Sequence, residues 1–348
     1  MAAMEKNFRV KLKKPFFCLA PMSDVTDVAF RMLLAKYGKN SKNKGQVVFW
    51  TEFVSADGLC DAKGYKKLKH ALKFTRAEKP IVAQVFGAKP ETMERACKII
   101  SKFGFDGIDI NMGCPDRSVI RQGAGSALIK NPKLARELIQ AAIRGAGGLP
   151  ISVKTRVGFN TEEIDTWIPE LLKEDIKALT IHARTRKEMS TVPANWAYVK
   201  RVVDLVKKSK KNILVIGNGD IKNLAEGRKR INETGCDGVM VGRGVFGNPW
   251  FFSETTPHHL PSKTQYSFLE KEESQWVLLK IKALAEHIKI FDKKLVKTKD
   301  KNYAVMKKHF KAYISGWDGA KELRSRMMET ESPREGLAIL TTFQKTLK

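Results

Sequence analysis

Short apolar runs with high β-propensity recur eight times along the first two thirds of the chain. They cover residues 16–22, 47–54, 81–87, 107–113, 151–158, 178–184, 213–220 and 238–244. Between several of them the apolar period changes to that of an amphipathic helix, as in 91–103, 132–143, 162–172 and 196–206. Strand–helix units repeated in this way predict an α/β fold, a (β/α)8 TIM barrel, with an open doubly wound sheet as the alternative.

The ends of these runs favour the barrel over the open sheet. Nearly every run finishes in polar or glycine residues, among them Gln84, Asn111, Lys154 and His182. The carboxyl ends of the strands in a barrel all meet at one rim, where barrel enzymes build their active sites. We therefore expect these side chains to surround a single site.

The pattern changes after residue 252. Residues 253–267 are rich in Pro, His, Ser and Thr, which predicts a linker, and residues 268–348 carry a helical pattern with no strand. Helices are expected at 303–314, 320–328 and 336–346, among others. The predicted domains are a catalytic barrel over 1–252, a linker over 253–267 and a small C-terminal helical bundle over 268–348.

Charge is the unusual feature of the composition. The chain has 64 Lys and Arg against 37 Asp and Glu, a net charge of +27, and residues 253–348 alone contribute 19 against 12. Such an imbalance indicates a polyanionic partner, most often nucleic acid, with an adaptation for solubility as the alternative. The five cysteines lack any CxxC spacing, which argues against a disulfide framework or a metal site.

Targeting signals are not evident in the pattern. The basic N-terminal segment leads into an apolar run too short for a signal-peptide core, and no apolar run reaches membrane-spanning length. These features predict a soluble, cytoplasmic protein.

Cys114 is the first candidate for chemistry. It follows the apolar run 107–113 directly, precedes Pro115, and leads into a glycine-rich loop at 123–126. A lone cysteine is most often a buried structural residue. A thiolate nucleophile or a protonated general acid are the two functional alternatives.

Glycine-rich segments follow the last two predicted strands, at 217–220 and 242–244. Glycines let the backbone approach a phosphate closely, and many barrels bind phosphate after strands seven and eight. Arg243 adds a bidentate charge partner, although tight turns alone also explain the glycines. One isolated histidine is usually a core residue, but His182 stands at a strand end beside Arg184, which favours a place in the site.

The stretch from Ile108 to Ser126 resembles the motif of the tRNA-dihydrouridine synthases, apolar-Asp-apolar-Asn-x-Gly-Cys-Pro followed by Gly-Ala-Gly-Ser. Further matches follow one another along most of the chain, at 20–22, 84–87, 154–156, 182–186, 217–220 and 242–243. The resemblance implies an FMN-dependent oxidoreductase that uses NADPH or NADH to reduce the C5=C6 bond of a D-loop uridine in tRNA. The uridine has to be flipped out of the folded tRNA to reach the flavin.

The resemblance also implies roles for individual residues. It makes Cys114 the acid that protonates C5 of the uracil while hydride reaches C6. Among the implied FMN contacts, Gln84 suits the pyrimidine edge of the flavin and Lys154 its N1/C2 edge. The full set is Pro21, Met22, Gln84, Lys154, His182, Asn218, Gly219, Asp220, Gly242 and Arg243. The implied tRNA contacts are Asn111, Arg121, Arg184, Arg186 and Arg324. We expect no bound metal and a monomeric protein.

One loop departs from the family pattern. Residues 187–192 read Lys-Glu-Met-Ser-Thr-Val, where the family usually has a Gln, a Tyr and a Gly, and this bears on RNA contacts rather than on the flavin site. Two other functions remain open. An FMN barrel oxidoreductase acting on a small molecule, such as a free pyrimidine, fits the +27 charge and the helical extension less well. A non-catalytic RNA-binding barrel leaves Cys114, Lys154 and His182 without a purpose.

Overall fold

The protein is described here by a computed structural model covering residues 12–39, 46–253 and 269–347. Contacts divide the chain into two units, the first made of 1–26 and 42–243 and the second of 27–41 and 244–348. Apart from Ser253, the predicted linker lies outside the described residues. The predicted domain limits stay a prediction.

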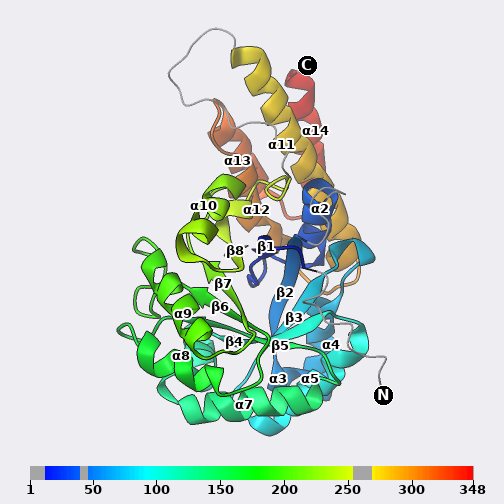
Figure 1. Ribbon diagram of the computed structural model, residues 1–348. Helices are drawn as coiled ribbons and strands as arrows, with labels where there is room; N and C mark the ends of the chain where they lie inside the picture. The colour runs from blue at the N-terminus through cyan, green and yellow to red at the C-terminus, as the bar shows by residue number, and fades with distance from the viewer. Residues whose placement is uncertain (1–11, 40–45, 254–268, 348) are drawn as a thin grey trace. The chain divides into compact units, whose positions relative to one another are not determined.

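The first unit is a closed barrel of eight parallel strands in sequence order (Figure 1). The strands are β1 (Phe16–Leu19), β2 (Val47–Ser55), β3 (Ile81–Phe86), β4 (Gly107–Met112), β5 (Ile151–Arg156), β6 (Ala178–His182), β7 (Leu214–Asn218) and β8 (Gly238–Val241). Pairing of β1 with β8, from Phe16 with Gly238 to Leu19 with Val241, closes the ring. The TIM-barrel prediction is confirmed.

Most predicted strands run one to three residues beyond the strand that forms. The run 16–22 contains β1, which ends at Leu19, and the run 238–244 contains β8, which ends at Val241. The excess residues include Pro21, several glycines, Asp220 and two arginines, together with a few apolar residues such as Met22, and they form the rim loops. Composition alone therefore marks the rim correctly, although it overestimates the strand length.

Side chains inside the barrel change from apolar to polar along the strand direction. Phe16, Cys18, Trp50, Val82 and Met240 belong to one buried apolar cluster. Closer to the rim the interior side chains are polar: Gln84 on β3 and Asp109 on β4 are fully buried, Asn111 nearly so, and Lys154 on β5 partly buried. Since successive residues of a strand face opposite sides, Asp109 and Asn111 on β4 share the interior while Ile108 and Ile110 face outward.

Amphipathic helices cover the outside of the barrel (Figure 1). They are α5 (Pro90–Ile100), α7 (Pro132–Gly145), α8 (Ile164–Leu172), α9 (Trp196–Lys208) and α10 (Leu224–Thr234). Shorter helices follow β2, namely α3 (Ala56–Cys60) and α4 (Ala62–Leu68), and β4, namely α6 (Arg117–Arg121). Helix α7 illustrates the local signals. Asn131 caps it by accepting a hydrogen bond from the Leu134 backbone N–H at 3.2 Å, and Pro132 begins the first turn.

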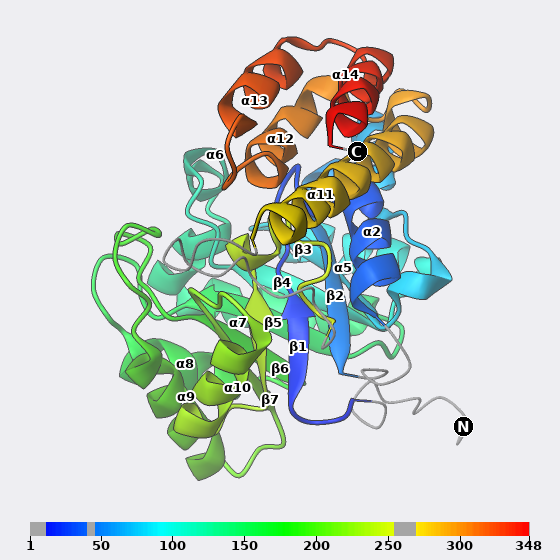
Figure 2. The same ribbon diagram turned by 90° about the horizontal axis from the view of Figure 1, so that it is seen from above.

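The second unit is entirely helical in its described residues. It comprises α2 (Val28–Gly38), α11 (Leu269–Phe291), α12 (Lys307–Tyr313), α13 (Ala320–Glu329) and α14 (Pro333–Thr346), and α11 lies between α2 and α14 (Figure 2). Leu33 of α2 shares a buried apolar cluster with Ile281 of α11 and Phe310 of α12. The prediction of a helical C-terminal region is confirmed.

Helix α2 follows β1 in the chain but belongs to the second unit. Tyr37 Oη donates to Glu286 Oε2 at 2.7 Å, and Lys36 Nζ lies 2.6 Å from Glu286 Oε1. These contacts, together with the shared apolar cluster, attach α2 to α11. No helix among the described residues is long and apolar enough to span a membrane.

Candidate active site

A cavity of about 260 Å³ opens at the carboxyl ends of the strands. Its walls come from seven of the eight strands or the loops that follow them, so residues far apart in sequence converge there as the barrel prediction requires. It is lined by Ala20, Pro21, Met22, Phe53, Asn111, Gly113, Cys114, Pro115, Lys154, Arg156, His182, Arg184, Ser190, Asn218, Gly219, Asp220, Gly242 and Arg243.

Four of the predicted site residues are not among these lining residues. Gln84 lies wholly inside the barrel, where it is hydrogen bonded to Asp109 and Asn111. Arg121 is exposed on α6, and Arg186 is half-buried beside Phe159. Arg324 belongs to the second unit, where its Nη1 donates to the Ile314 carbonyl at 3.1 Å.

Cys114 stands on a turn that Asn111 caps. Asn111 Oδ1 accepts hydrogen bonds from the backbone N–H groups of Gly113 at 3.1 Å and Cys114 at 2.9 Å. Burial raises the pKa of the Cys114 thiol above its usual value, against the smaller lowering effect of a hydrogen bond with the Asp116 backbone. The thiol therefore keeps its proton at neutral pH, which favours a general acid over a thiolate nucleophile.

The Cys114 turn also requires a glycine on the facing loop. Gly125 has a φ of +62°, and a Cβ on it would lie 2.9 Å from the Cys114 carbonyl oxygen. The Ser126 backbone N–H donates to the same oxygen at 3.1 Å. The glycine-rich segment after Cys114 thus holds the turn from the other side.

Arg156 is a cavity residue that the sequence reasoning did not single out. Its Nε donates to the Gly113 carbonyl, and its Nη1 donates to the carbonyls of Thr185 and Met189, each at 2.9 Å. It therefore ties the Cys114 turn to the loop after β6. The signal was present in the sequence, because Arg156 is two residues from Lys154 on one strand and so shares its face.

Lys154 places a partly buried ammonium in the cavity wall. Its Nζ donates to Asn218 Oδ1 at 3.0 Å, and Asn218 Nδ2 in turn donates to the Met240 carbonyl at 2.8 Å. Burial, reinforced by Arg156, lowers the pKa of Lys154 to about 8. The group still carries its charge at neutral pH.

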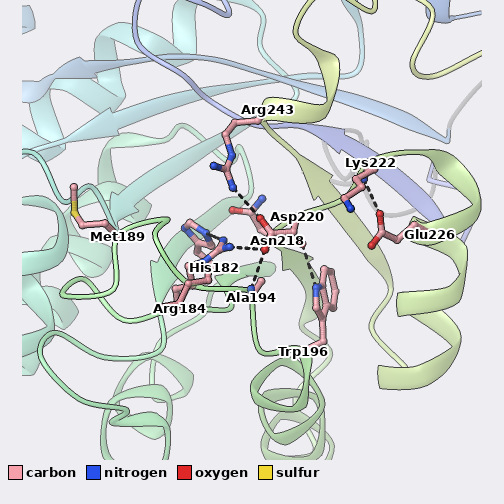
Figure 3. Close-up of polar contacts among 12 residues, drawn as sticks. His182, Arg184, Met189, Ala194, Trp196, Asn218, Asp220, Lys222, Glu226 and Arg243 are labelled. Carbon is pink, nitrogen blue, oxygen red and sulfur yellow. Dashed lines mark hydrogen bonds and ion pairs between the residues drawn. The ribbon is translucent and has the colours of Figure 1, made fainter. Parts of the chain in front are cut away.

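His182 is held in one neutral form. Burial and then the charges of Arg156, Lys154 and other nearby cations lower the pKa of His182 well below its usual value. Arg184 Nη1 lies 3.1 Å from His182 Nε2 (Figure 3). A guanidinium has only donors, so Nε2 accepts and the ring proton resides on Nδ1.

Asp220 joins two arginines at the cavity edge (Figure 3). Arg184 pairs with its Oδ2, and Arg243 Nη2 lies 2.8 Å from its Oδ1. Burial opposes ionisation of Asp220, but hydrogen bonding from the Ala194 backbone and the two arginines outweigh it and lower the pKa. Lys154, Arg156, Arg184 and Arg243 line the cavity together with this one carboxylate, which leaves the site net positive and suited to an anion.

Comparison with known proteins decides the family. The model of the family described as dihydrouridine synthase matches residues 18–348. The chain belongs to the dihydrouridine synthase family. It is 38% identical over 342 residues to a probable tRNA-dihydrouridine synthase of Staphylococcus aureus (strain COL), covering 98% of this chain and 97% of the relative. A probable tRNA-dihydrouridine synthase 2 of Bacillus subtilis (strain 168) is 40% identical over 343 residues, with 98% of each chain covered.

A solved structure supports the fold of this dihydrouridine synthase family member. A 2-naphthoyl-CoA reductase complex matches 68% of this chain and 49% of that chain, with a TM-score of 0.51 and 10% sequence identity. Likeness at that identity concerns the barrel alone. The resemblance stated from residues 108–126 is confirmed by the family match over the whole barrel and helical region.

The last two strand ends of this family member form a backbone cradle. Gly219 has a φ of +142°, and a Cβ on it would lie 2.5 Å from the Ala194 Cβ. Trp196 Nε1 donates to the Gly219 carbonyl at 3.1 Å, which anchors the loop from below (Figure 3). Gly242 and Arg243 complete the edge after β8. No cluster of three or more His, Cys, Asp or Glu suited to a metal occurs in the described part of the chain.

Proposed function

We propose that the protein is a tRNA-dihydrouridine synthase, which reduces the C5=C6 bond of a D-loop uridine with FMN as cofactor and NADPH or NADH as reductant. The observation that carries the proposal is a protonated thiol, Cys114, in the wall of a net positive cavity at the barrel rim. The relatives' names, which specify tRNA-dihydrouridine synthases, give the reaction. We further propose that the protein acts as a monomer in the cytoplasm.

The donor set fits a phosphorylated flavin. The glycine backbone after β7 and β8, with Arg243 beside it, lines the cavity and suits a phosphate group. Lys154 supplies a partly buried positive charge for an electron-rich ring edge, and Met22 and Pro21 supply apolar contact. Bound FMN supplies hydride chemistry. His182, Asn218, Asp220 and Gly242 complete the proposed contacts, and Gln84 supports them from inside the barrel.

Cys114 completes the reduction of the pyrimidine. Addition of hydride at C6 leaves negative charge across C5 and the C4 carbonyl, and a proton transferred from Cys114 Sγ to C5 neutralises it. The resulting thiolate regains a proton from solvent. A cysteine with a raised pKa suits this role, because it must arrive at the reaction in its protonated form.

RNA contacts are proposed for the cations around the same rim. Lys130 Nζ lies 4.1 Å and the Arg186 guanidinium carbon 5.1 Å from the centre of the Phe159 ring, so one aromatic ring holds two positive charges near each other. Two like charges fixed in this way suit a phosphate. Exposed Arg121 and, in the helical unit, Arg324 are further proposed contacts, while buried Arg184 and Asn111 face the cavity and the flipped base.

Removing the shared ring tests this surface. Phe159→Leu keeps Lys130 and Arg186 but releases both cations, so we expect KM for tRNA to rise roughly five- to thirtyfold, in line with about 0.5–1 kcal/mol for each of the two cation–π contacts. Flavin content and kcat should stay unchanged. Phe74→Leu is the matched control, because Lys79 lies over Phe74 at 5.8 Å just before β3, at the opposite end of the barrel. Equal KM values in both variants would show that the RNA does not bind at Phe159.

The function itself is tested by product analysis. The protein, supplied with FMN and NADPH, is incubated with unmodified tRNA, and the nucleosides are digested and quantified by mass spectrometry. We expect dihydrouridine in the tRNA and no dihydrouridine from free uridine or uracil. Reduction of the free pyrimidine alone would favour the small-molecule oxidoreductase, and no reduction of either would favour a non-catalytic RNA-binding barrel.

A further inference from the structure

A continuous chain of hydrogen bonds joins a carboxylate inside the barrel to the turn that bears Cys114. Gln84 Nε2 donates to Asp109 Oδ2 at 2.6 Å, and Asn111 Nδ2 donates to Gln84 Oε1 at 2.9 Å. Asn111 Oδ1 then accepts from the Cys114 backbone N–H at 2.9 Å. Asp109 and Gln84 have no exposed surface and Asn111 only 6%, so solvent competes little for these bonds.

The direction of this chain is set by its buried end. An amide can present either its oxygen or its nitrogen to a neighbour, whereas an ionised carboxylate can only accept. Asp109 therefore forces Gln84 to present Nε2 inward and Oε1 toward Asn111. That in turn forces Asn111 to present Nδ2 to Gln84, which leaves its oxygen for the N–H groups of Gly113 and Cys114.

Asp109 also accepts a hydrogen bond from a residue outside this chain of hydrogen bonds. Ser152 Oγ donates to its other oxygen, Oδ1, at 2.5 Å. Burial raises the pKa of Asp109 to about 6, while hydrogen bonds from Gln84 and Ser152 and the charge of Lys154 limit the rise. The carboxyl is therefore ionised at neutral pH and acts as an acceptor only.

We propose that Asp109 is a positioning residue for Cys114, acting through the amides of Gln84 and Asn111 to orient the turn that presents the thiol. Its effect on catalysis rests on the proposed function, whereas its effect on the turn does not. We call this chain of hydrogen bonds, from Asp109 through Gln84 to Asn111, the relay. Gln84 is its middle member, which accounts for its burial beneath the cavity wall. Reversal of either amide would bring Asn111 Nδ2 against two backbone N–H donors and open the turn.

Four variants distinguish an effect of the relay on the Cys114 turn from the general effect of changing a buried residue. Asp109→Leu removes the terminal acceptor, and Gln84→Met interrupts the middle. Asp109→Asn keeps an oxygen that accepts from Gln84 while its amide group meets the Ser152 hydroxyl, so it should restore the relay. Ser152→Ala removes a bond to the same carboxylate outside the relay and serves as the matched control. Thermal unfolding of each variant reports whether the fold persists.

The first readout needs neither flavin nor tRNA. Alkylation of Cys114 by iodoacetamide is followed by peptide mass spectrometry, with partly buried Cys60 as the internal reference. Loss of about one buried hydrogen bond loosens the turn, so the Cys114 to Cys60 rate ratio should rise roughly tenfold in Asp109→Leu and Gln84→Met. It should stay within about twofold of wild type in Asp109→Asn and Ser152→Ala.

The second readout measures flavin reduction and dihydrouridine formation separately. With NADPH, the rate of flavin reduction should be unchanged in the Asp109 and Ser152 variants, whereas dihydrouridine formation should slow in Asp109→Leu and Gln84→Met and recover in Asp109→Asn. If wild type makes no dihydrouridine, the proposed function fails while the alkylation ratio still decides the relay. An unchanged or lower alkylation ratio in folded Gln84→Met overturns the relay, even if Asp109→Leu does not fold.

Discussion

At the scale of single residues, position rather than residue type distinguishes the reactive cysteine. Burial raises the pKa of Cys18, Cys97 and Cys114 alike, and that of Cys97 reaches about 12. Only Cys114 of these three lines the cavity, whereas Cys18 belongs to the apolar barrel core. The sequence indicated this difference, because Gly113 and Pro115 interrupt the strand pattern on either side of the thiol.

Replacement of the thiol should separate the two half-reactions. Cys114→Ala should keep bound flavin and NADPH oxidation but lose dihydrouridine formation by roughly a hundredfold or more, as expected when a general acid is removed. Cys60→Ala, a partly exposed cysteine on α3, is the control and should match wild type. Full activity of Cys114→Ala would show that the thiol is not the proton donor in the reaction.

Lys154 should impose a pH dependence on stability in the flavin-free protein. Its pKa is about 8 in the fold against 10.5 for the free side chain, so the unfolded chain binds more protons between these values and stability rises with pH across them. Below about pH 8 the partly buried charge costs up to about 3 kcal/mol. Lys154→Met should therefore unfold at a higher temperature than wild type at pH 7.

The difference between the two melting curves is the informative quantity. Lys280 also has its pKa lowered to about 8 by burial and contributes to both proteins, so it cancels in the comparison. The advantage of Lys154→Met should shrink as the pH rises from about 8 to 10.5. A difference that stays constant over this range would show that Lys154 titrates normally in the folded chain.

At the scale of elements, the alternation of strands and helices predicted the barrel, and the polar strand ends predicted where its cavity lies. Two features lay beyond such reasoning. Helix α2 follows β1 in the chain yet packs on α11, and only a long-range contact such as Tyr37 with Glu286 reveals it. Gln84 is enclosed by Asp109 and Asn111 through a register between neighbouring strands that the sequence does not encode locally. Arg156 was accessible from strand periodicity.

The close packing of α9 on β7 should make one glycine indispensable. A Cβ on Gly217 would lie 2.3 Å from Trp196 Cζ3, and Trp196 also anchors the Gly219 loop. Gly217→Ala should therefore destabilise the protein by about 1–3 kcal/mol and weaken flavin binding through the displaced loop.

Calorimetry and flavin titration measure both effects of Gly217→Ala. The compensating variant Gly217→Ala/Trp196→Leu makes room for the new methyl group, so its melting temperature should recover in part. Its flavin affinity should stay low because the hydrogen bond from Trp196 Nε1 to the Gly219 carbonyl is lost. A melting temperature of Gly217→Ala equal to wild type would contradict the packing argument.

At the scale of the whole molecule, net charge and family membership both favour a nucleic-acid partner. The net charge of +27 predicted a polyanion from the sequence alone, and the family match names relatives that are probable tRNA-dihydrouridine synthases. Composition could not say which cations act, because that depends on contacts such as those of Phe159 with Lys130 and Arg186, or on the pairing of Arg184 with Asp220. A salt bridge inside the site and a charge facing RNA look alike in a sequence.

We propose that one cavity passes electrons from a nicotinamide to a uridine in tRNA. The most direct test of this proposal is the visible spectrum of the flavin-loaded protein under anaerobic conditions, recorded after stoichiometric NADPH and again after unmodified tRNA. We expect NADPH to bleach the flavin bands, the bands to stay bleached until tRNA is added, and their return to match the dihydrouridine formed. A protein that binds no FMN, or whose reduced flavin ignores tRNA, would contradict the proposal.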